Sequence, residues 1–247
     1  MTDSILARPN RARAGVFSLA QASPDGPQAD ADYLAWHLLD HLPEQYRNDA
    51  LVLGSRWEST PACRAHRAAR TSASPDAARF EAVHHVTHYL FADPVDQALE
   101  DFLALGGELA ALGRYPVRLP GVMLGAYDVA EVAAARRVRV SAPAIPFRPT
   151  RGAYLVLEPA PAATADERVE HLERLVEVDG VAGAWRFSPS DHRPDRFDAA
   201  GLTATLLHLD EDPVTVAPAV EAVLDAAWQR WGTAPALAGP FQTVRLA

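Results

Sequence analysis

The chain has 247 residues, of which 49% are hydrophobic, and it carries a formal net charge of -9 at pH 7 with a pI of about 5.4. This acidic balance argues against a nucleic-acid partner, because binding to a phosphate backbone depends on basic side chains that displace counterions. The chain contains no lysine, which excludes lysine Schiff-base chemistry and the phosphate-binding lysine of a P-loop.

The expected compartment follows from the cysteine count and the N-terminal residues. The single cysteine, Cys63, cannot form an internal disulfide, and the first residues lack the apolar core of a signal peptide. No apolar run approaches the roughly 18 residues that a membrane span needs. We therefore expect a cytoplasmic protein that has no membrane partner.

The first half of the chain is predicted to alternate strands with helices. Residues 1–14 lack periodicity and are expected to form a mobile tail. In residues 30–42 the leucines recur every four positions, which predicts a helix that Pro43 ends. The other expected elements are a strand at 15–20, strands at 50–57 and 80–91, a helix at 94–105 and a fourth strand at 136–141.

The second half repeats this order of elements. Strands are expected at 153–158, 181–187, 202–209 and 241–246, with helices at 165–178 and 213–231. Each half is then a ferredoxin-like βαββαβ unit, with helices on one face of a four-stranded sheet. The predicted fold class is α+β, with two tandem repeats, 15–145 and 151–247, packed sheet to sheet as an intramolecular α+β barrel.

Internal similarity indicates that the halves arose by duplication. The stretch from Ala31-Asp32 to His37-Leu38 returns at 165–172, and Ser55-Arg56-Trp57 returns at 185–187. Four histidines of the first half have no counterpart, however. His41, His84, His85 and His88 correspond to Leu175, Thr203, Ala204 and Leu207. We therefore expect the first repeat to carry the active site and the second to be degenerate.

The helix motif of the first half resembles one known superfamily. The run from Asp32-Tyr33 through Trp36-His37 to His41-Leu42-Pro43 is similar to a helix of the dimeric α+β barrel superfamily. Its branches include EthD-like proteins, antibiotic-biosynthesis monooxygenases, muconolactone isomerases and polyketide cyclases. The resemblance implies a small-molecule enzyme in which two fused copies replace the usual dimer, and a further homodimer is left open.

The candidate site residues lie on elements that should pack together. His37 and His41 are four residues apart on one helix, while His84 and His88 share one face of a strand and His85 and Tyr89 share the other. A neutral imidazole in an apolar pocket suits proton transfer. The predicted catalytic residues are His41, His88 and His85, and the predicted substrate contacts are His37, His84, Tyr89, Trp36, Arg56 and Trp57.

Several functions fit this pattern. The first hypothesis is a lyase, isomerase or cyclase that uses histidine acid/base catalysis on a small, largely apolar substrate, with no cofactor and no metal. Alternatives are a cofactor-independent or haem-dependent monooxygenase, and a non-catalytic ligand-binding or stress-type barrel. The helix and strand histidines are also ligand types that zinc, copper or iron prefers. Arg56 and its counterpart Arg186 either stack or pair with a carboxylate, or they bind a substrate carboxylate.

Overall fold

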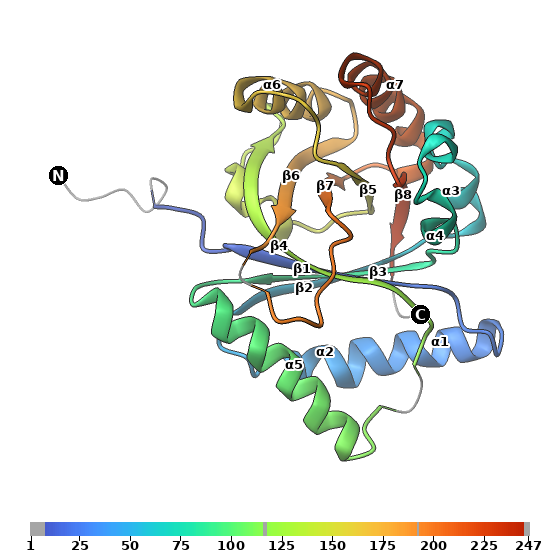
Figure 1. Ribbon diagram of the computed structural model, residues 1–247, viewed down its shortest axis with the longest axis vertical. Coiled ribbons are helices and arrows are strands. Elements are labelled where there is room, and N and C mark those ends of the chain that lie inside the picture. Colours follow the sequence, from blue (N-terminus) through green and yellow to red (C-terminus); the bar gives the residue numbers. More distant parts are fainter. Residues whose placement is uncertain (1–7, 116–117, 192, 245–247) are drawn as a thin grey trace.

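The computed structural model describes residues 8–115, 118–191 and 193–244. Its strands close into one antiparallel barrel in the order β1-β3-β2-β8-β5-β7-β6-β4, and this confirms the expected α+β barrel (Figure 1). The strands are β1 (Ala14–Ala20), β2 (Leu51–Glu58), β3 (His85–Phe91), β4 (Gly121–Ala134), β5 (Gly152–Pro159), β6 (Val181–Pro189), β7 (Leu202–Leu209) and β8 (Leu237–Thr243).

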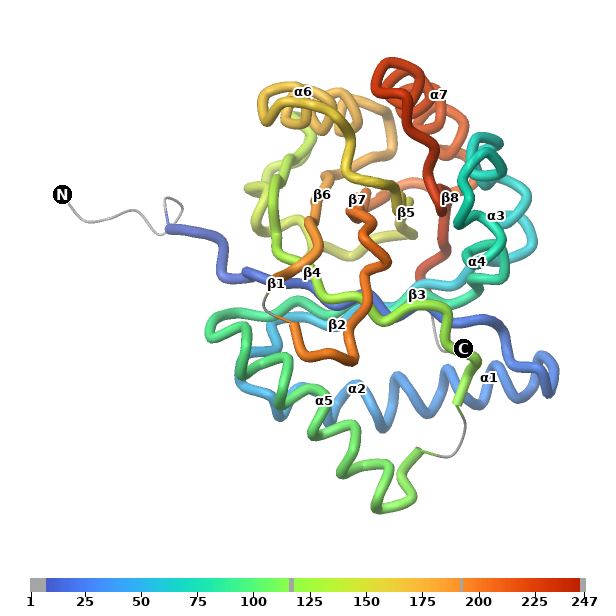
Figure 2. The backbone as a smooth tube through the Cα atoms, viewed as in Figure 1, coloured from blue at the N-terminus to red at the C-terminus, as the bar shows by residue number. Residues whose placement is uncertain are grey.

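The two halves of the barrel have the same strand order. Strands of the first half lie in the order β4-β1-β3-β2, and those of the second half in the order β8-β5-β7-β6. Strands β4 and β6 join the halves along a long ladder, whereas β2 and β8 pair only at Trp57 with Thr243 and Glu58 with Gln242. The path of the chain through both halves can be followed in Figure 2.

Helices cover the barrel on opposite sides (Figure 1). The first-half helices are α1 (Pro27–Trp36), the π-helical segment η2 (His37–His41), α2 (Leu42–Gln45) and α5 (Val95–Ala111), and the second-half helices are α6 (Ala165–Val176) and α7 (Pro213–Trp231). Short helical segments complete the connections, namely α3 (Pro61–Ala65), η3 (Ala69–Ala73), α4 (Ala77–Glu81) and η4 (Ala142–Phe147). Within the described part of the chain, no helix is both long and apolar enough to cross a membrane.

The barrel interior is a single apolar core to which both halves contribute. Its large side chains include Phe17, Trp57, Tyr127, Trp185, Phe187 and Phe241. Alternate residues of β3 take part, because successive side chains of a strand point to opposite faces. Val86 and Leu90 therefore lie inside the barrel, while Tyr89 and Phe91 pack toward the helices. This alternation decides which histidines can reach the helices.

Three sequence predictions about the elements are wrong. The fourth strand is β4, which pairs with both β1 and β6, whereas residues 136–141 form turns and bends after it. Residues 80–91 are not one strand, because α4 precedes β3. The helix also continues past Pro43, which directly follows the π-helical segment as the second residue of α2. Of the expected N-terminal tail, residues 1–7 lie outside the described residues, and Ala14 already belongs to β1.

Candidate active site

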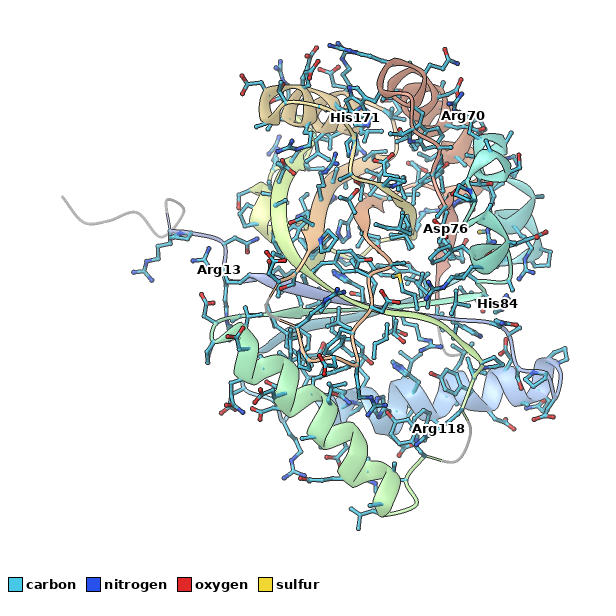
Figure 3. All side chains as sticks on the ribbon, viewed as in Figure 1. Arg13, Arg70, Asp76, His84, Arg118 and His171 are labelled. Carbon is cyan, nitrogen blue, oxygen red and sulfur yellow. The ribbon has the colours of Figure 1, made fainter. Side chains whose placement is uncertain are left out.

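A cavity of about 290 Å³ lies between the first-half helices and the outer face of their sheet. This volume is near the lower end of the roughly 300–1,000 Å³ of small-molecule pockets. Its lining is rich in aromatic and histidine side chains, namely Tyr33, Trp36, His37, His41, Tyr89 and Tyr115. Arg118, also part of the lining, marks this side of the molecule in Figure 3, where His171 lies at the opposite end beside α6.

The two cavity histidines come from a π turn in a long helix. The N–H of Leu42 bonds to the carbonyl oxygen of His37, five residues earlier, between the α-helical segments α1 and α2. Single π turns are rare in proteins and occur frequently at functional sites. Here both imidazoles are buried, with exposed fractions of 3% for His37 and 6% for His41, and their ring centroids are 5.4 Å apart.

Each of these histidines is held through one ring nitrogen only. His37 Nε2 lies 3.0 Å from the hydroxyl of Tyr89. His41 Nε2 lies 3.2 Å from Gln45 Nε2 and 3.2 Å from the hydroxyl of Tyr115, and the ring stacks on Trp36. The Nδ1 atoms of both histidines are buried and have no hydrogen-bond partner among the described residues. The imidazoles are thus oriented, and neutral His41 accepts at Nε2 and carries its proton on Nδ1, because the amide nitrogen of Gln45 can only donate.

Burial keeps the polar groups of the cavity uncharged. It lowers the pKa of His41 to about 4 and that of His37 well below its usual value, and the positive charge of Arg56 adds to both effects. Burial also raises the pKa of Tyr115 to about 12 and shifts the pKa of Tyr89 upward. At neutral pH the histidines are therefore proton acceptors. An anion bound beside them would raise their pKa values, because it stabilises the charged form.

Arg56 lies buried behind the cavity and has no acidic partner. Its exposed fraction is 5%, its Nη1 donates to the hydroxyl of Thr87 at 2.8 Å, and its guanidinium stacks 4.8 Å from the ring centroid of Tyr33. No carboxylate among the described residues forms an ion pair with it. Its counterpart Arg186 is buried too, but lies 3.8 Å from a carboxylate oxygen of Glu131. An uncompensated buried cation is costly and favours an anionic ligand nearby.

The structure brings most of the predicted site residues together. His37, His41, Trp36 and Tyr89 line the cavity, and Arg56 lies behind Tyr33. His84 and His85 lie at the start of β3, beside Asp30. The sequence analysis missed several lining residues, namely Tyr33, Gln45, Tyr115, Arg118 and Arg196. Only Tyr33 and Gln45 have a local signal, since they belong to the same helix as the histidines.

Two predicted site residues lie on the wrong side of the sheet. His88 was expected within reach of His41, but it points into the barrel, where its ring stacks 4.3 Å from that of Phe17. Trp57 is also in the interior core, and its ring centroid is 6.4 Å from that of His88. Both are separated from the cavity by the sheet itself, so they are not in position to contact its ligand.

The interior position of His88 predicts a pH-dependent stability. Burial lowers the pKa of His88 to about 3, with a smaller contribution from His208, so the unfolded chain binds more protons between about pH 3 and pH 6.5. Stability must therefore fall as the pH drops through this range. At pH 5 the loss from His88 should be about 2 kcal/mol. His88→Leu should remove that part of the loss in urea unfolding at pH 7.5 and pH 5.0.

The matched control is His66→Leu, because His66 is exposed. We expect this variant to keep the pH dependence of the wild-type protein. Identical pH dependence in His88→Leu and the wild type would contradict the prediction.

Comparison with known proteins gives structural likeness only. No protein-family model matches the chain, and no curated protein matches its sequence. A structure provisionally assigned as a chlorite dismutase is 10% identical, with a TM-score of 0.55, covering 95% of this chain and 96% of its own. An anthrone oxidase-like protein is 11% identical and has a TM-score of 0.56, and the alignment covers 98% of this chain and 94% of the other. A provisional monooxygenase from Fusobacterium nucleatum is 9% identical and has a TM-score of 0.48, and the alignment covers 96% of this chain and 94% of the other.

These likenesses correct the expectation that no cofactor is involved. Chlorite dismutases are haem-dependent, so this fold includes proteins that bind a cofactor. The described residues do not fit a haem as they stand. His41 and Arg118 have suitable donor types, but the cavity of about 290 Å³ is small even for a drug-sized ligand. Beside His171 the cavity is only about 60 Å³. The likeness to these structures is thus one of fold, and the cavity suits a ligand smaller than haem.

Proposed function

We propose that the protein is an oxygenase of the monooxygenase type, which binds a small aromatic substrate in the first-half cavity and removes a proton from it. The observation that carries the proposal is the pair of buried, uncharged histidines that line the cavity, beside the Arg56 guanidinium, which forms no ion pair with a carboxylate of the described residues. The aromatic walls formed by Trp36 and Tyr115 favour a planar, largely apolar ligand, because flat rings stack on one another.

The first step is proton transfer to His41. Its Nε2 is the unprotonated nitrogen, because the amide nitrogen of Gln45 can only donate to it, and this nitrogen accepts a proton from an acidic CH₂ group of the substrate, while Gln45 and Tyr115 hold the ring. Arg56 lies close enough to act on His37 and His41 through space, and the same field stabilises the substrate carbanion. Burial strengthens this effect because little water is present to screen it.

Dioxygen then reacts with the carbanion and is the oxidant of the reaction. The carbanion adds O₂ to form a C–O bond, and the proton on His41 passes to the terminal peroxide oxygen. Loss of the second C–H proton breaks the O–O bond and releases water, which leaves a carbonyl group. The carbon gives up four electrons, so one oxygen atom is retained and the other leaves as water.

This proposal is favoured over the other functions considered. The same histidines would serve a lyase, isomerase or cyclase, but the structural neighbours include an anthrone oxidase-like protein. A non-catalytic barrel has no reason to bury the unpaired polar groups of His37, His41 and Arg56, since each lowers stability.

We also infer that the halves are duplicated ferredoxin-like units. Arg56 lies opposite Thr87 across β2 and β3, and Arg186 lies opposite Thr205 across β6 and β7. The shared strand order of the two halves supports the same origin. We place the substrate in the first unit because the histidine cavity has no counterpart in the second, where an apolar core that includes Trp228 packs under the helices and the groove of about 440 Å³ between α6 and β4 has no histidine in its lining.

Oxygen uptake with anthrone as the probe substrate tests the proposed function. We expect the protein to accelerate O₂ consumption with one O₂ used per anthrone, and ¹⁸O₂ to label one oxygen atom of the product. Heat-denatured protein gives the background rate of autoxidation. Stacking of anthrone in the cavity without accelerated oxygen uptake would favour a binding protein, and conversion without oxygen uptake would favour lyase or isomerase chemistry.

A further inference from the structure

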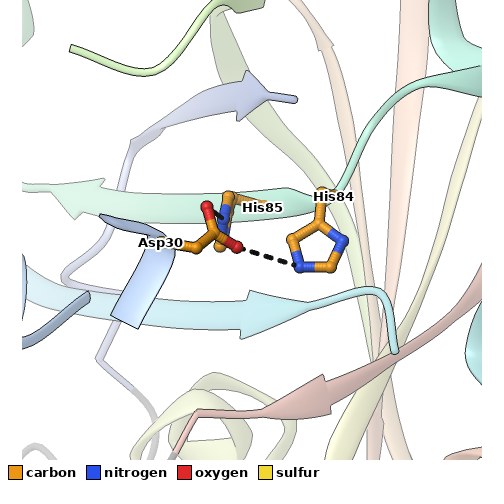
Figure 4. Close-up of side chains that lie close together, drawn as sticks. All are labelled: Asp30, His84 and His85. Carbon is orange, nitrogen blue, oxygen red and sulfur yellow. Dashed lines mark hydrogen bonds and ion pairs between the residues drawn. The ribbon is translucent and has the colours of Figure 1, made fainter. Parts of the chain in front are cut away.

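We propose that Asp30, His84 and His85 form a binding site for a divalent transition metal of the zinc type. The three side chains meet where the first turn of α1 approaches the start of β3, at one end of the region that holds the histidine cavity. Figure 4 shows both imidazole rings beside the Asp30 carboxylate. Among the described residues, this is the one group of three or more such ligands within reach of a single ion.

The two distances between the Asp30 carboxylate and the imidazoles are close to the ligand spacing around a bound ion. His85 Nε2 is 3.0 Å from Asp30 Oδ1, and His84 Nε2 is 3.4 Å from Asp30 Oδ2. One ligand atom from each of the three residues can be chosen so that all three lie within 4.8 Å of one another. A tetrahedral ion with metal–ligand bonds of about 2.0–2.1 Å separates its ligands by about 3.3 Å. Only small side-chain adjustments are therefore needed to hold an ion.

The fold holds the three side chains from separate elements. Asp30 Oδ1 also accepts a hydrogen bond of 2.8 Å from the backbone N–H of Ser23, which fixes the carboxylate. Adjacent residues in a strand point to opposite faces, but His84 lies just before β3 and so escapes this rule. Its ring and that of His85 are 4.6 Å apart at 84°, and both reach the same carboxylate. This convergence is set by the backbone, so it exists before any ion binds.

The donor set indicates which ions would bind. Two imidazoles and one carboxylate suit zinc and the other first-row transition metals, whereas magnesium and calcium prefer oxygen ligands. Three protein ligands leave a position for water. The side chains of His84 and Asp30 are 17% and 13% exposed, while that of His85 is 1% exposed. The site thus has one buried wall and an opening to solvent through which an ion can enter.

Arg64 controls the site through His84. Its Nη2 lies 3.1 Å from His84 Nδ1, which must be unprotonated to accept that hydrogen bond. A metal on Nε2 requires the proton on Nδ1, because a neutral imidazole carries one proton. Metal binding therefore competes with Arg64, whose positive charge also repels the ion. Further positive charge comes from Arg67 and Arg56, while Glu58 acts in the opposite direction.

Cobalt titration of the full-length, chelator-treated protein tests the site. We expect Co²⁺ to produce visible d–d absorption bands at one equivalent, and Zn²⁺ to displace it. Asp30→Asn and His84→Gln should weaken Co²⁺ binding by at least about 10-fold. Arg64→Ala should strengthen it, because the competing donor and its charge are removed. His66→Gln, which changes an exposed histidine of the same half, is the matched control and should bind as the wild type does.

The outcomes separate a metal site from a pair of structural hydrogen bonds. His84 is partly exposed, so its replacement should leave the circular dichroism spectrum unchanged and report on binding alone. Unchanged Co²⁺ affinity in folded His84→Gln and Asp30→Asn would overturn the proposal. The proposal would also be overturned if the wild-type protein bound Co²⁺ no more tightly than a variant that lacks all three ligands. The readout does not depend on oxygen uptake, so it stands or fails independently of the proposed oxygenase activity.

Discussion

Replacing His41 with alanine is expected to lower the rate of anthrone oxidation by about 100-fold to 10,000-fold, the usual loss when a general base is removed. His41 is the cavity histidine held by two partners, Gln45 and Tyr115, so its Nε2 is the better oriented base. Folding should be retained, because the ring lies at the edge of a cavity rather than within the barrel core. Initial rates of oxygen uptake at saturating anthrone measure the effect.

The control for this prediction is His171→Ala in the second half. His171 packs against Trp231 beside a cavity too small for a substrate, so the variant should keep the wild-type rate. His88→Ala should likewise alter stability more than rate, since His88 lies inside the barrel. Equal loss of activity in His171→Ala and His41→Ala, with both proteins folded, would mean that the site is not confined to the first half.

Arg186→Met is expected to destabilise the protein by about 3–5 kcal/mol, while Arg56→Met should leave stability unchanged or increase it. The two arginines are buried to the same degree, with exposed fractions of 4% and 5%. Removing Arg186 takes the neighbouring positive charge away from the buried carboxylate of Glu158, whereas Glu131 keeps its 3.0 Å ion pair with Arg168. Removing Arg56 leaves no carboxylate of the described residues without a partner. Urea unfolding at pH 7.5 gives both values.

A second measurement on these variants concerns the ligand. Arg56→Met should weaken binding of an anionic aromatic probe such as 1-naphthoate, followed by quenching of tryptophan fluorescence, because Trp36 lines the cavity. Arg186→Met should bind the probe as the wild type does at a temperature where it is folded. Equal destabilisation by the two substitutions, together with unchanged probe binding, would contradict the role given to Arg56.

The sequence predicts the barrel well and the site only in part. Periodicity and internal similarity locate most strands, and they bring the helix with His37 and His41 next to β3. The alternation along β3 also places His85 and His88 on opposite faces, but nothing local says which face turns to the helices. That choice depends on the closed barrel, which needs Val86 and Leu90 in its core.

Other parts of the site have no signal in a single sequence. Tyr115 and Arg196 reach the cavity from connections far along the chain, and their positions depend on how α5 and the second half pack. The strand β4 was missed because its alanines and glycines have weak strand propensity, and pairing on both edges stabilises it instead. The meeting of Asp30 with two histidines likewise depends on contacts across the fold.

The π turn limits how the first-half site could be rebuilt in the second half. Eighteen residues separate His37 from Arg56 in the first half, whereas fourteen separate His171 from Arg186 in the second. The added length follows the position of His41 and supplies the turn that carries Gln45. Point substitutions alone therefore cannot transplant the site into the second half: Leu175→His would place an imidazole at the position of His41, but α6 ends at Val176, before the position that Gln45 occupies in the first half. An insertion is required, and any scheme to build a barrel with two working sites has to begin with backbone length.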